Sequence, residues 1–436
     1  MKVLVIGSGG REHALVWKLA QSPRITEMWC APGNGGVALE KLRNGNPVQC
    51  VGIAAEDLNG LAKFAHREEI DFTMVGPDNP LAAGIVDLFQ EMRMRIWGPT
   101  KKAAQFEAPK AFSQEFMERH GIPTAKSGTF TEAGLAKKFA SSLGGKCAVK
   151  ADGLALGKGV LICHDEPEAG AAIDEILVKG SFGAAGKRIV IQEYLEGVEV
   201  SLHALCDGET AKLFPTSQDH KRALDNDEGL NTGGMGTYSP TPILNEAELE
   251  MLERVIIDPW LRGCKAEGID YCGILYPGIM LTKEGPKVLE FNARFGDPET
   301  QVYLMRLEID LLELLEASVE RRLAEHTLRW RREAALCVVM ASGGYPGSYT
   351  KGHTISGLQT VAAMPNVKVF HAGTMLNREE VLTCGGRVLG VTALGPDLLA
   401  ARDLAYLAGE KIQFEGAHYR RDIAAKALKG SSRAEA

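Results

Sequence analysis

Short apolar runs alternate with segments of helical periodicity over the first hundred residues. The apolar runs are KVLVI, ITEMWC and IDFTMV, and the helical segments extend from Glu12 to Ala20, from Glu56 to Arg67 and from Leu81 to Met92. In the second and third helical segments the apolar residues recur every three or four positions, so one face of each helix can cover a sheet. This alternation predicts a doubly wound parallel sheet.

The pattern changes after Pro123, where strand-like runs become dense: KSGTF, KCAVKA, GVLIC, RIVIQEYL and VEVSLHALC. These runs predict a separate antiparallel unit between about residues 123 and 205. A mixed segment follows to about residue 325 and ends in a leucine-rich helix, IDLLELLEASVERRLAE. The last hundred residues begin with the apolar run AALCVVMA and contain a helical segment from Pro396 to Ile412, which predicts a small third domain of α+β type.

Composition and charge narrow the class of protein. Hydrophobic residues make up 45% and charged residues 24% of the 436 residues, and no run approaches the roughly 18 apolar residues of a membrane span. The first apolar run is short and ends in glycines, which is typical of a strand and not of a signal peptide, so we expect a cytoplasmic protein. The nine cysteines form no C-x-x-C pair, which indicates neither disulfides nor zinc. The net charge of −7 argues against a nucleic-acid partner but leaves room for local basic pockets that bind small anions, so any phosphate-bearing ligand should be small.

Two glycine-rich loops follow the first two predicted strands. They are GSGGREH, with Gly9 and Gly10, and APGNGG, with Asn34 and Gly35. Both lie at the carboxyl ends of neighbouring strands, where open α/β sheets bind ligands. The dinucleotide fingerprint fails, because Glu12 stands where a third glycine belongs and no acid follows the second strand. The loops therefore predict an anion site, and the alternative is a turn that only packs a helix on a strand.

A third loop, ADGLALGKGV, follows Lys150 and contains Gly153, Gly157, Lys158 and Gly159. Its spacing differs from a P-loop, which indicates another kind of nucleotide site. Between two strands it would form a hairpin tip whose amide groups approach phosphate while Lys158 adds charge; the alternative is a mobile hairpin without a ligand.

The stretch VLEFNARFGDPETQ carries the clearest candidate chemistry. Glu290 and Asn292 are two residues apart on a predicted strand and project from one face, with Arg294 next on that side. Their oxygens suit magnesium bound together with nucleotide phosphates, and the guanidinium of Arg294 suits a carboxylate or phosphate.

A long polar loop, QDHKRALDNDEGLNTGGMGTYSP, is also typical of a functional segment. His220 within it is at least as well explained as a structural or solvated histidine, so we assign it no catalytic role. No cysteine or serine has the setting of a nucleophile.

At this point a family resemblance emerges. QDHKR followed by NTGGMGTYSP, together with GPKVLEFNARFGDPETQ, resembles the signature of the phosphoribosylamine–glycine ligase family of the ATP-grasp superfamily. Agreement extends over nearly the whole chain, through GSGGREHA, APGNGG, VGPDNPL, GPTKKAAQFE, VKADGLALGKGV, YPGSY, FHAGT, GGRVLGVTALG and YRRDI. Motifs of this length in this order are highly specific.

The resemblance implies three domains. They are an N-terminal α/β substrate-binding domain over residues 1–102, an ATP-grasp domain over 103–326 with a lid at about 123–192, and a barrel-like C-terminal α+β domain over 327–430. Residues 431–436 are polar and expected to be disordered.

The resemblance further implies an ATP-dependent ligase of purine biosynthesis that joins glycine to 5-phosphoribosylamine through a glycyl phosphate. Arg294 and Lys150 would be catalytic, and Glu290 and Asn292 would hold Mg²⁺, or Mn²⁺ in its place. ATP would contact Lys110, Lys150, Gly157, Lys158, Glu193, Tyr194, Leu195 and Glu199. The other substrates would contact Gly9, Gly10, Asn34, Gly35, Asp219, Asn231, Thr232, Gly233, Gly234, Arg294 and Asp297. We expect a monomer or weak oligomer.

Departures from the family pattern are few. Asp78 stands where the family usually has Glu, Leu156 where it has Ala, and Asn226 and Leu230 where it has Gly and Pro. The strand GILYPGIML carries no acid, although many ATP-grasp enzymes have one there, which leaves the number of magnesium ions open.

The sequence disfavours three other functions. A ligase for another acid or amine is disfavoured by QDHKR and NTGGMG, and a nicotinamide oxidoreductase by the incomplete dinucleotide fingerprint. A regulatory protein without catalysis is disfavoured by the joint presence of Glu290, Asn292 and Arg294.

Overall fold

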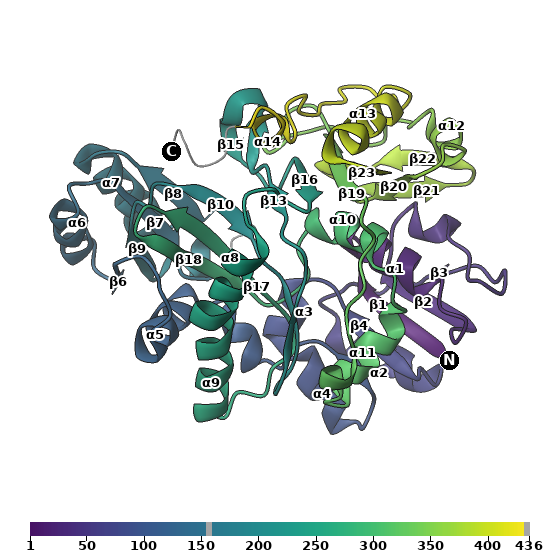
Figure 1. Ribbon diagram of the computed structural model, residues 1–436, viewed down its shortest axis with the longest axis horizontal. Helices are drawn as coiled ribbons and strands as arrows, with labels where there is room; N and C mark the ends of the chain where they lie inside the picture. The colour runs from purple at the N-terminus through teal and green to yellow at the C-terminus, as the bar shows by residue number, and fades with distance from the viewer. Residues whose placement is uncertain (154–158, 431–436) are drawn as a thin grey trace.

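The computed structural model describes residues 1–153 and 159–430. Figure 1 shows an N-terminal sheet region, a projecting four-stranded unit on the left and a C-terminal region at the top, with a central sheet between them. The predicted tail at 431–436 lies outside the described residues.

The N-terminal sheet is parallel and has the strand order β3-β2-β1-β4-β5. Alternate residues of β1 enter two different cores: Val3 and Val5 pack with α1, and Leu4 and Ile6 pack with α2 and α4. The prediction of a doubly wound sheet is therefore confirmed. The elements are β1 (Lys2–Gly7), α1 (Gly10–Leu19), β2 (Glu27–Pro32), β3 (Gln49–Cys50), α2 (Leu58–Arg67), β4 (Phe72–Val75), α3 (Asp78–Ala83), α4 (Ile85–Glu91) and β5 (Ile96–Trp97).

The helix expected over residues 81–92 differs from the structure. Two helices, α3 and α4, meet at Gly84, whose φ of +98° lies in the left-handed region that glycine adopts at little cost. The sequence pattern alone did not reveal this break, because the apolar spacing continues across it.

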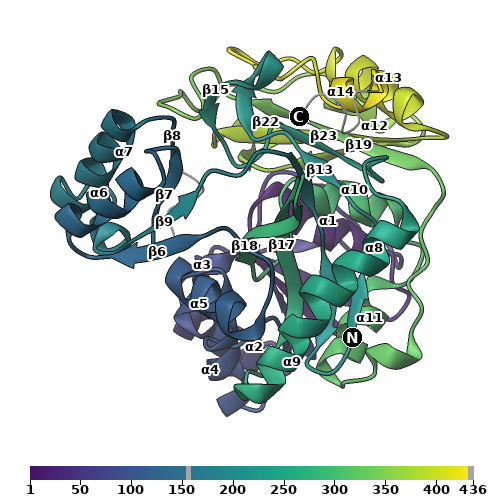
Figure 2. The same ribbon diagram turned by 60° about the vertical axis from the view of Figure 1, so that its left-hand side comes forward.

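The four-stranded unit has its own antiparallel sheet, in the order β6-β9-β7-β8, and its own apolar core. Figure 2 shows it standing apart from the body of the molecule. Its elements are β6 (Ser127–Phe130), α6 (Ala133–Ser142), β7 (Cys147–Ala151), β8 (Val160–Cys163), α7 (Glu166–Ile173) and β9 (Ile189–Glu193). The antiparallel unit thus ends at Glu193 and not near residue 205.

The strands after Glu193 belong to a second antiparallel sheet, in which β17 pairs with β10, β11 and β18, and β11 also pairs with β12. Helices α5 and α9 pack beside it around Trp260 and Phe106. The elements are α5 (Lys110–His120), β10 (Val198–Ser201), β11 (Ala204–Asp207), β12 (Ala211–Leu213), α8 (Glu246–Leu252), α9 (Asp258–Ala266), β17 (Cys272–Thr282), β18 (Gly285–Asn292), α10 (Glu299–Arg306) and α11 (Leu311–Val319).

A third sheet, in the order β13-β16-β19-β23-β20, joins strands of the long polar loop to the C-terminal region. The pairings describe an open sheet with separate hairpins, so they do not confirm the expected barrel-like form. The elements are β13 (Gln218–Asp219), β14 (Arg222–Leu224), β15 (Glu228–Asn231), β16 (Gly236–Ser239), β19 (Ala334–Ala341), α12 (Leu358–Ala362), β20 (Val367–His371), β21 (Thr374–Asn377), β22 (Glu380–Thr383), β23 (Arg387–Gly395), α13 (Leu398–Gly409) and α14 (Ala425–Leu428).

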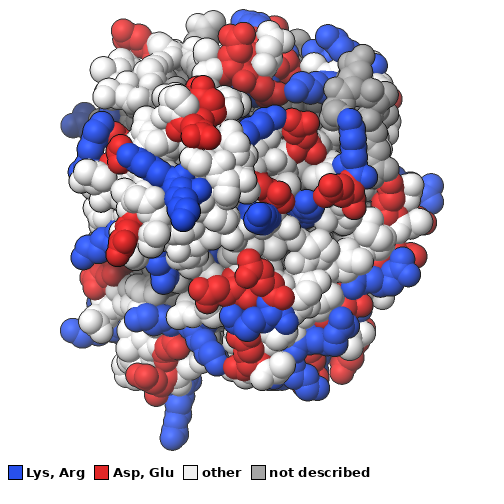
Figure 3. Space-filling model, turned by 90° about the vertical axis from the view of Figure 1, so that its left-hand side faces the viewer, with Lys and Arg blue, Asp and Glu red and all other residues white. Residues whose placement is uncertain are grey.

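The surface carries charges of both signs on the face shown in Figure 3. On the face seen in Figure 3, basic and acidic side chains are interspersed and do not form one large patch of a single sign. Within residues 1–153 and 159–430, no helix has both the length and the apolar character needed to cross a membrane.

Candidate active site

A cavity of about 1240 Å³ lies where the sheets meet. Its lining comes from every part of the fold: Arg11 and Asp78 of the N-terminal region, Ile162 of the four-stranded unit, Glu290 of the central sheet and Arg387 of the C-terminal region. A large concave site with converging polar groups is the usual form of a ligand-binding site.

The predicted phosphate and metal residues meet on one wall of this cavity. Strand β7 presents Lys150, the start of α5 presents Lys110, and β18 presents Glu290 and Asn292, all of which line the cavity. Lys150 is only 5% exposed, and its Nζ donates to the carbonyl oxygen of Leu289 at 3.1 Å. The sequence prediction that Glu290 and Asn292 share a site thus agrees with their position.

Burial and charge set the protonation states on this wall. Burial lowers the pKa of Lys150 to about 8, although the carboxylate of Glu290 opposes this change. Burial alone would raise the pKa of Glu290, but the cations Lys110, Lys150, Lys221 and Arg294 together lower it to about 2. Glu290 is therefore an ionised oxygen donor at neutral pH.

The donor set fits magnesium shared with a ligand. Glu290 and Asn292 supply one carboxylate and one amide oxygen, and Mg²⁺ commonly takes one or two protein oxygens and completes its shell with water and phosphate. Over the described ranges no group of three or more His, Cys, Asp and Glu residues could hold a metal by itself. All nine cysteines are free.

Arg294 lies beyond the end of β18 and lines the same cavity. Its Nη2 lies 3.0 Å from Oε1 of Glu107 and donates to Oδ1 of Asn292 at 3.3 Å. Oε2 of Glu107 accepts the backbone N–H of Ala293 at 2.9 Å. One buried carboxylate therefore fixes both the guanidinium and the chain that carries it.

The predicted nucleotide residues lie along β9 and β10. Glu193, Tyr194, Leu195 and Glu199 all line the cavity, and Glu199 forms an ion pair with Lys221. Gly157 and Lys158 lie outside the described residues, so the structure gives no position for them.

Most of the residues predicted to bind the other substrates also border the cavity. Asp219, Asn231, Thr232, Gly233 and Asp297 line it. Gly234 lies just behind this turn with a φ of +114°, and a Cβ there would lie 2.7 Å from Oδ1 of Asp219, so only glycine fits.

The N-terminal glycine loops do not border the cavity in the part of the chain that the structure describes. The residues concerned are Gly9, Gly10, Asn34 and Gly35. The N–H of Gly9 donates to Glu12 Oε2 at 2.6 Å, and the backbone N–H of Arg11 is bound to the carboxylate of Asp297. Two protein carboxylates thus occupy the start of α1.

The side chain of Asn34 connects the second loop to the C-terminal region. Its Nδ2 donates to the carbonyl oxygen of His371 at 2.8 Å, and its Oδ1 accepts N–H groups of Gly36 and Val37. The geometry gives these loops a packing role, and their contact with substrate stays a prediction.

Several residues of the site were not predicted from the sequence. Arg387 donates to the carbonyl oxygens of Gly233 at 2.5 Å and Asp297 at 2.7 Å, and Glu107 holds Arg294. These partners are separated by 90 to 187 residues, so spacing could not join them. In the sequence, Arg387 and Glu107 were marked only by their positions within the family-like motifs GGRVLGVTALG and GPTKKAAQFE.

His220 has a structural setting. Its Nδ1 lies 3.2 Å from the carbonyl oxygen of Gly236, and its Nε2 accepts the N–H of Ala424 at 3.2 Å. Burial, together with Arg420, lowers its pKa to about 4. Both ring nitrogens thus contact backbone groups.

Comparisons with known proteins place the chain in a family. Family models for phosphoribosylglycinamide synthetase match in three parts: the N domain over residues 1–107, the ATP-grasp (A) domain over 108–300 and the C domain over 335–426. Relatives named phosphoribosylamine–glycine ligase from Allochromatium vinosum and Vibrio cholerae are 49% and 47% identical over 429 residues, which cover 98% of this chain and 99% of each relative.

Solved structures agree with these matches. The crystal structure of phosphoribosylamine–glycine ligase from Thermotoga maritima has a TM-score of 0.81 at 30% identity, covering 97% of this chain and 100% of that one. The biotin carboxylase domain of 2-oxoglutarate carboxylase from Hydrogenobacter thermophilus shares the fold, with a TM-score of 0.74 at 16% identity over 96% of this chain and 91% of that one. The chain therefore belongs to the phosphoribosylamine–glycine ligase family, whose central unit is an ATP-grasp domain.

Proposed function

We propose that this chain uses ATP to join glycine to 5-phosphoribosylamine, giving glycinamide ribonucleotide, ADP and phosphate in de novo purine biosynthesis. The observation that carries the proposal is one cavity lined by Lys150, Glu290 and Arg294 together with residues 231–233 of the polar loop. The family of the chain supplies the identity of the acid and the amine.

The first step transfers the γ-phosphoryl group. A carboxylate oxygen of glycine attacks the γ-phosphorus, the bond to the β–γ bridging oxygen breaks, and ADP leaves with that electron pair. Lys110, Lys150, Gly157 and Lys158 are assigned to the ATP phosphates, Glu193, Tyr194 and Leu195 to adenine, and Glu199 to the ribose. Mg²⁺, or Mn²⁺ in its place, would supply neutralisation of phosphate charge when bound at Glu290 and Asn292.

The second step forms the amide. The amine nitrogen of the sugar attacks the carbonyl carbon of glycyl phosphate, phosphate leaves with the bridging oxygen, and the nitrogen releases a proton. Arg294 is assigned to glycine and then to the acyl phosphate. Asp219, residues 231–234 and Asp297 are assigned to the phosphoribosyl amine. Gly9, Gly10, Asn34 and Gly35 of the N-terminal loops are assigned to the same substrate.

Positioning supplies much of the rate acceleration in this proposal. Holding two reactants in line is worth on the order of 7–11 kcal/mol, so no side-chain nucleophile is needed. Closure of the four-stranded unit as a lid over ATP would exclude water, which otherwise hydrolyses the acyl phosphate.

The proposal extends to the setting of the enzyme. We assign residues 1–102, 103–326 and 327–430 to three domains and place a monomer or weak oligomer in the cytoplasm. Its partners are then its small-molecule substrates, without nucleic acid or membrane.

The test is ADP release on mixing ATP, magnesium, glycine and freshly prepared phosphoribosylamine, with each omitted in turn. We expect sustained ADP release, beyond a single turnover of enzyme, only with all four present. ADP release that does not depend on glycine would contradict the assigned acid, and sustained release at an unchanged rate without the sugar amine would contradict the assigned acceptor.

A further inference from the structure

The hairpin β14–β15 borders the cavity, and its own strand pairing is too limited to fix its position. Its strands contain three and four residues, pair only with each other over the described chain, and have an irregular register between Arg222 and Leu224. Leu224 is 46% and Leu230 67% exposed. Isolated two-stranded hairpins are marginally stable, so contacts from elsewhere must fix the position of this one.

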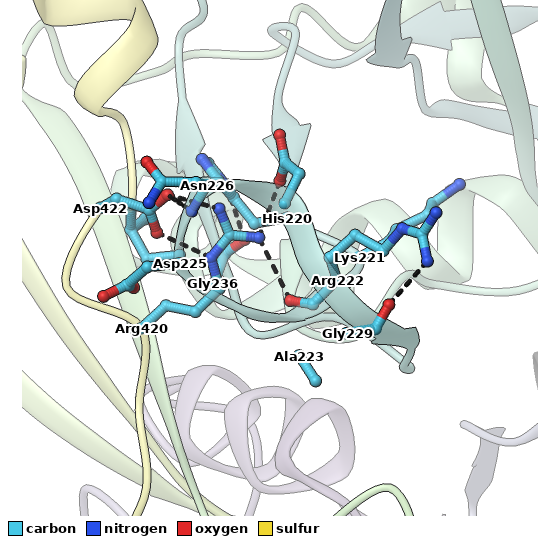
Figure 4. Close-up of polar contacts among 12 residues, drawn as sticks. His220, Lys221, Arg222, Ala223, Asp225, Asn226, Gly229, Gly236, Arg420 and Asp422 are labelled. Atoms are coloured by element: carbon cyan, nitrogen blue, oxygen red, sulfur yellow. Dashed lines mark hydrogen bonds and ion pairs between the residues drawn. The ribbon is translucent and has the colours of Figure 1, made fainter.

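The C-terminal segment supplies those contacts through Arg420 (Figure 4). Its Nη1 donates to the carbonyl oxygen of Arg222 at 3.2 Å and to Oδ1 of Asp227 at 2.8 Å. The guanidinium is itself held by both carboxylate oxygens of Asp422, at 2.7 Å and 2.8 Å. With a side chain only 1% exposed, Arg420 connects the first strand of the hairpin to its tip.

The tip of the hairpin is fixed by further bonds to the same segment. Asn226 and Asp227 adopt the left-handed region, with φ of 58° and 57°, which Asn and Asp tolerate better than most residues. The N–H of Asn226 donates to Oδ2 of Asp422 at 2.8 Å, and the N–H of Arg421 donates to Oδ1 of Asp225 at 2.7 Å. The segment at residues 420–422 therefore both accepts and donates hydrogen bonds at the tip of the hairpin.

The base of the hairpin leads to the nucleotide side of the cavity. Lys221 directly precedes Arg222, and its carbonyl oxygen accepts the N–H of Thr232 at 2.7 Å, which closes the base. The ammonium group of Lys221 forms an ion pair with Glu199, and both residues line the cavity.

The turn that follows the hairpin is held by other groups. Nη1 of Arg387 donates to the carbonyl oxygen of Gly233 at 2.5 Å, and the N–H of Gly233 donates to the hydroxyl of Tyr345 at 3.2 Å. Loss of Arg420 should therefore disturb Lys221 and Glu199 more than the turn.

We propose that Arg420 is a positioning residue for the nucleotide: it holds the hairpin β14–β15 so that Lys221 keeps Glu199 in place for ATP. Arg420 is absent from the described lining of the cavity, so it acts through the hairpin and not by contact with the reactants. The inference rests on the proposed function, which assigns Glu199 to the ribose of ATP. It gives the C-terminal region a part in nucleotide affinity.

The test compares Arg420→Lys with wild type by calorimetric binding of ATP with magnesium and by steady-state kinetics for phosphoribosylamine. Lysine keeps the charge but cannot form all of the hydrogen bonds of the guanidinium, so ATP binding should weaken by about fivefold or more. The KM for phosphoribosylamine should change by less than about twofold, since the turn is held separately. The matched control is Arg421→Lys, because that exposed guanidinium only lies over Tyr419, at 5.3 Å from its ring centre.

A second variant separates positioning from general stability. In Arg420→Ala, added methylguanidinium should restore part of the ATP affinity, and amide exchange should speed up at residues 221–231 while the other regions keep their rates. Unchanged ATP affinity in folded Arg420→Lys would overturn the proposal, as would an equal rise in the KM for phosphoribosylamine or faster exchange throughout the chain. If wild type binds ATP but forms no amide product, the proposed function fails and the comparison of ATP affinities still tests Arg420.

Discussion

Arg294 contacts the buried carboxylate of Glu107 and also lines the cavity. These contacts determine the orientation of its guanidinium group. Burial opposes the charge, but the neighbouring carboxylate of Glu107 raises the pKa of Arg294, so the guanidinium remains protonated. Glu107 and Asn292 occupy Nη2, and Nη1 donates to the carbonyl oxygen of Phe295 at 3.3 Å. The orientation of the planar fork is thus set before substrate arrives.

The first prediction concerns this fork. Arg294→Lys keeps the charge but loses two parallel donors, and we expect a loss of transition-state stabilisation of about 2–4 kcal/mol. The loss should appear mainly in kcat, because negative charge builds on the transferring group. Steady-state kinetics for glycine and direct ATP binding measure it, with the exposed Arg262→Lys as control. Full turnover would show that the fork is dispensable, and a loss confined to ATP binding would move Arg294 to the nucleotide side.

The second prediction concerns Glu290. Glu290→Gln is nearly isosteric but removes the charge that Mg²⁺ prefers, so most activity should disappear while the fold remains. The control is Glu284→Gln, an exposed carboxylate on the same hairpin. Activity with titrated magnesium and thermal unfolding are the measurements. A variant that unfolds many degrees lower but has normal activity per folded molecule would make Glu290 a structural residue.

The third prediction uses the lowered pKa of Lys150. Its ammonium is charged below about pH 8 and becomes neutral as the pH rises further. ATP affinity should therefore weaken between pH 7 and pH 9, by up to about tenfold per pH unit above the pKa. Lys150→Arg stays charged over this range, so its affinity should depend much less on pH. Equal slopes for wild type and Lys150→Arg would contradict the assignment of Lys150 to the phosphates.

Side-chain chemistry within one motif could be predicted from the sequence, and contacts between distant motifs could not. Glu290 and Asn292 share a strand, so their common site followed from the two-residue period of a strand. The Glu107–Arg294 and Arg387–Asp297 pairs depend on how whole regions pack together. The glycines at 9 and 10 had the local pattern of an anion site, but the carboxylates of Glu12 and Asp297 reach that place from the protein itself.

At the scale of elements, the four-stranded unit is the part that we propose moves as a lid. Its core is separate from the core beneath the central sheet, and side-chain bonds to the body are few near the cavity, such as Lys150 to Leu289 and Gln192 to Gln114. Local units with their own cores open and close with lower free energy than the whole fold.

The fourth prediction follows from this arrangement. ATP with magnesium should slow amide exchange in β8 (Val160–Cys163), whose Val160 and Ile162 line the cavity, while β1 keeps its rate as an internal control. Slower exchange with nucleotide is also predicted for the loop at 153–159, most of which lies outside the described residues. Equal exchange of β8 with and without nucleotide would remove the lid from the mechanism.

Helices and strands could be predicted where the hydrophobic pattern of the segment alone identifies the element. The apolar run that forms β1 and the spacing in α2 correspond to buried positions in the structure. The runs that became β10 and β11 also read correctly as strands, but periodicity does not tell which sheet a strand joins. Helices α6 and α7 were missed within a segment where the strand pattern was stronger.

At the scale of the molecule, the cavity exists only because separate regions meet. The sheet β13-β16-β19-β23-β20 combines strands from the polar loop with strands from the C-terminal region, so these two parts cannot be cut apart without breaking a sheet. Arg387 and Tyr345 reach the cavity from that side, and Arg11 and Asp78 reach it from the N-terminal region. Groups from all of these regions are therefore available to bind the three substrates of the proposed reaction.

The formation of glycyl phosphate is tested most directly by following the oxygen atoms of glycine. Glycine labelled with ¹⁸O in both carboxylate oxygens is incubated with enzyme, ATP, magnesium and phosphoribosylamine, and the released phosphate is analysed by mass spectrometry. A glycyl phosphate intermediate requires one ¹⁸O in each released phosphate and the other in the new amide. Phosphate without ¹⁸O, formed together with the amide product, would contradict the acyl phosphate and with it the roles assigned to Arg294 and Lys150.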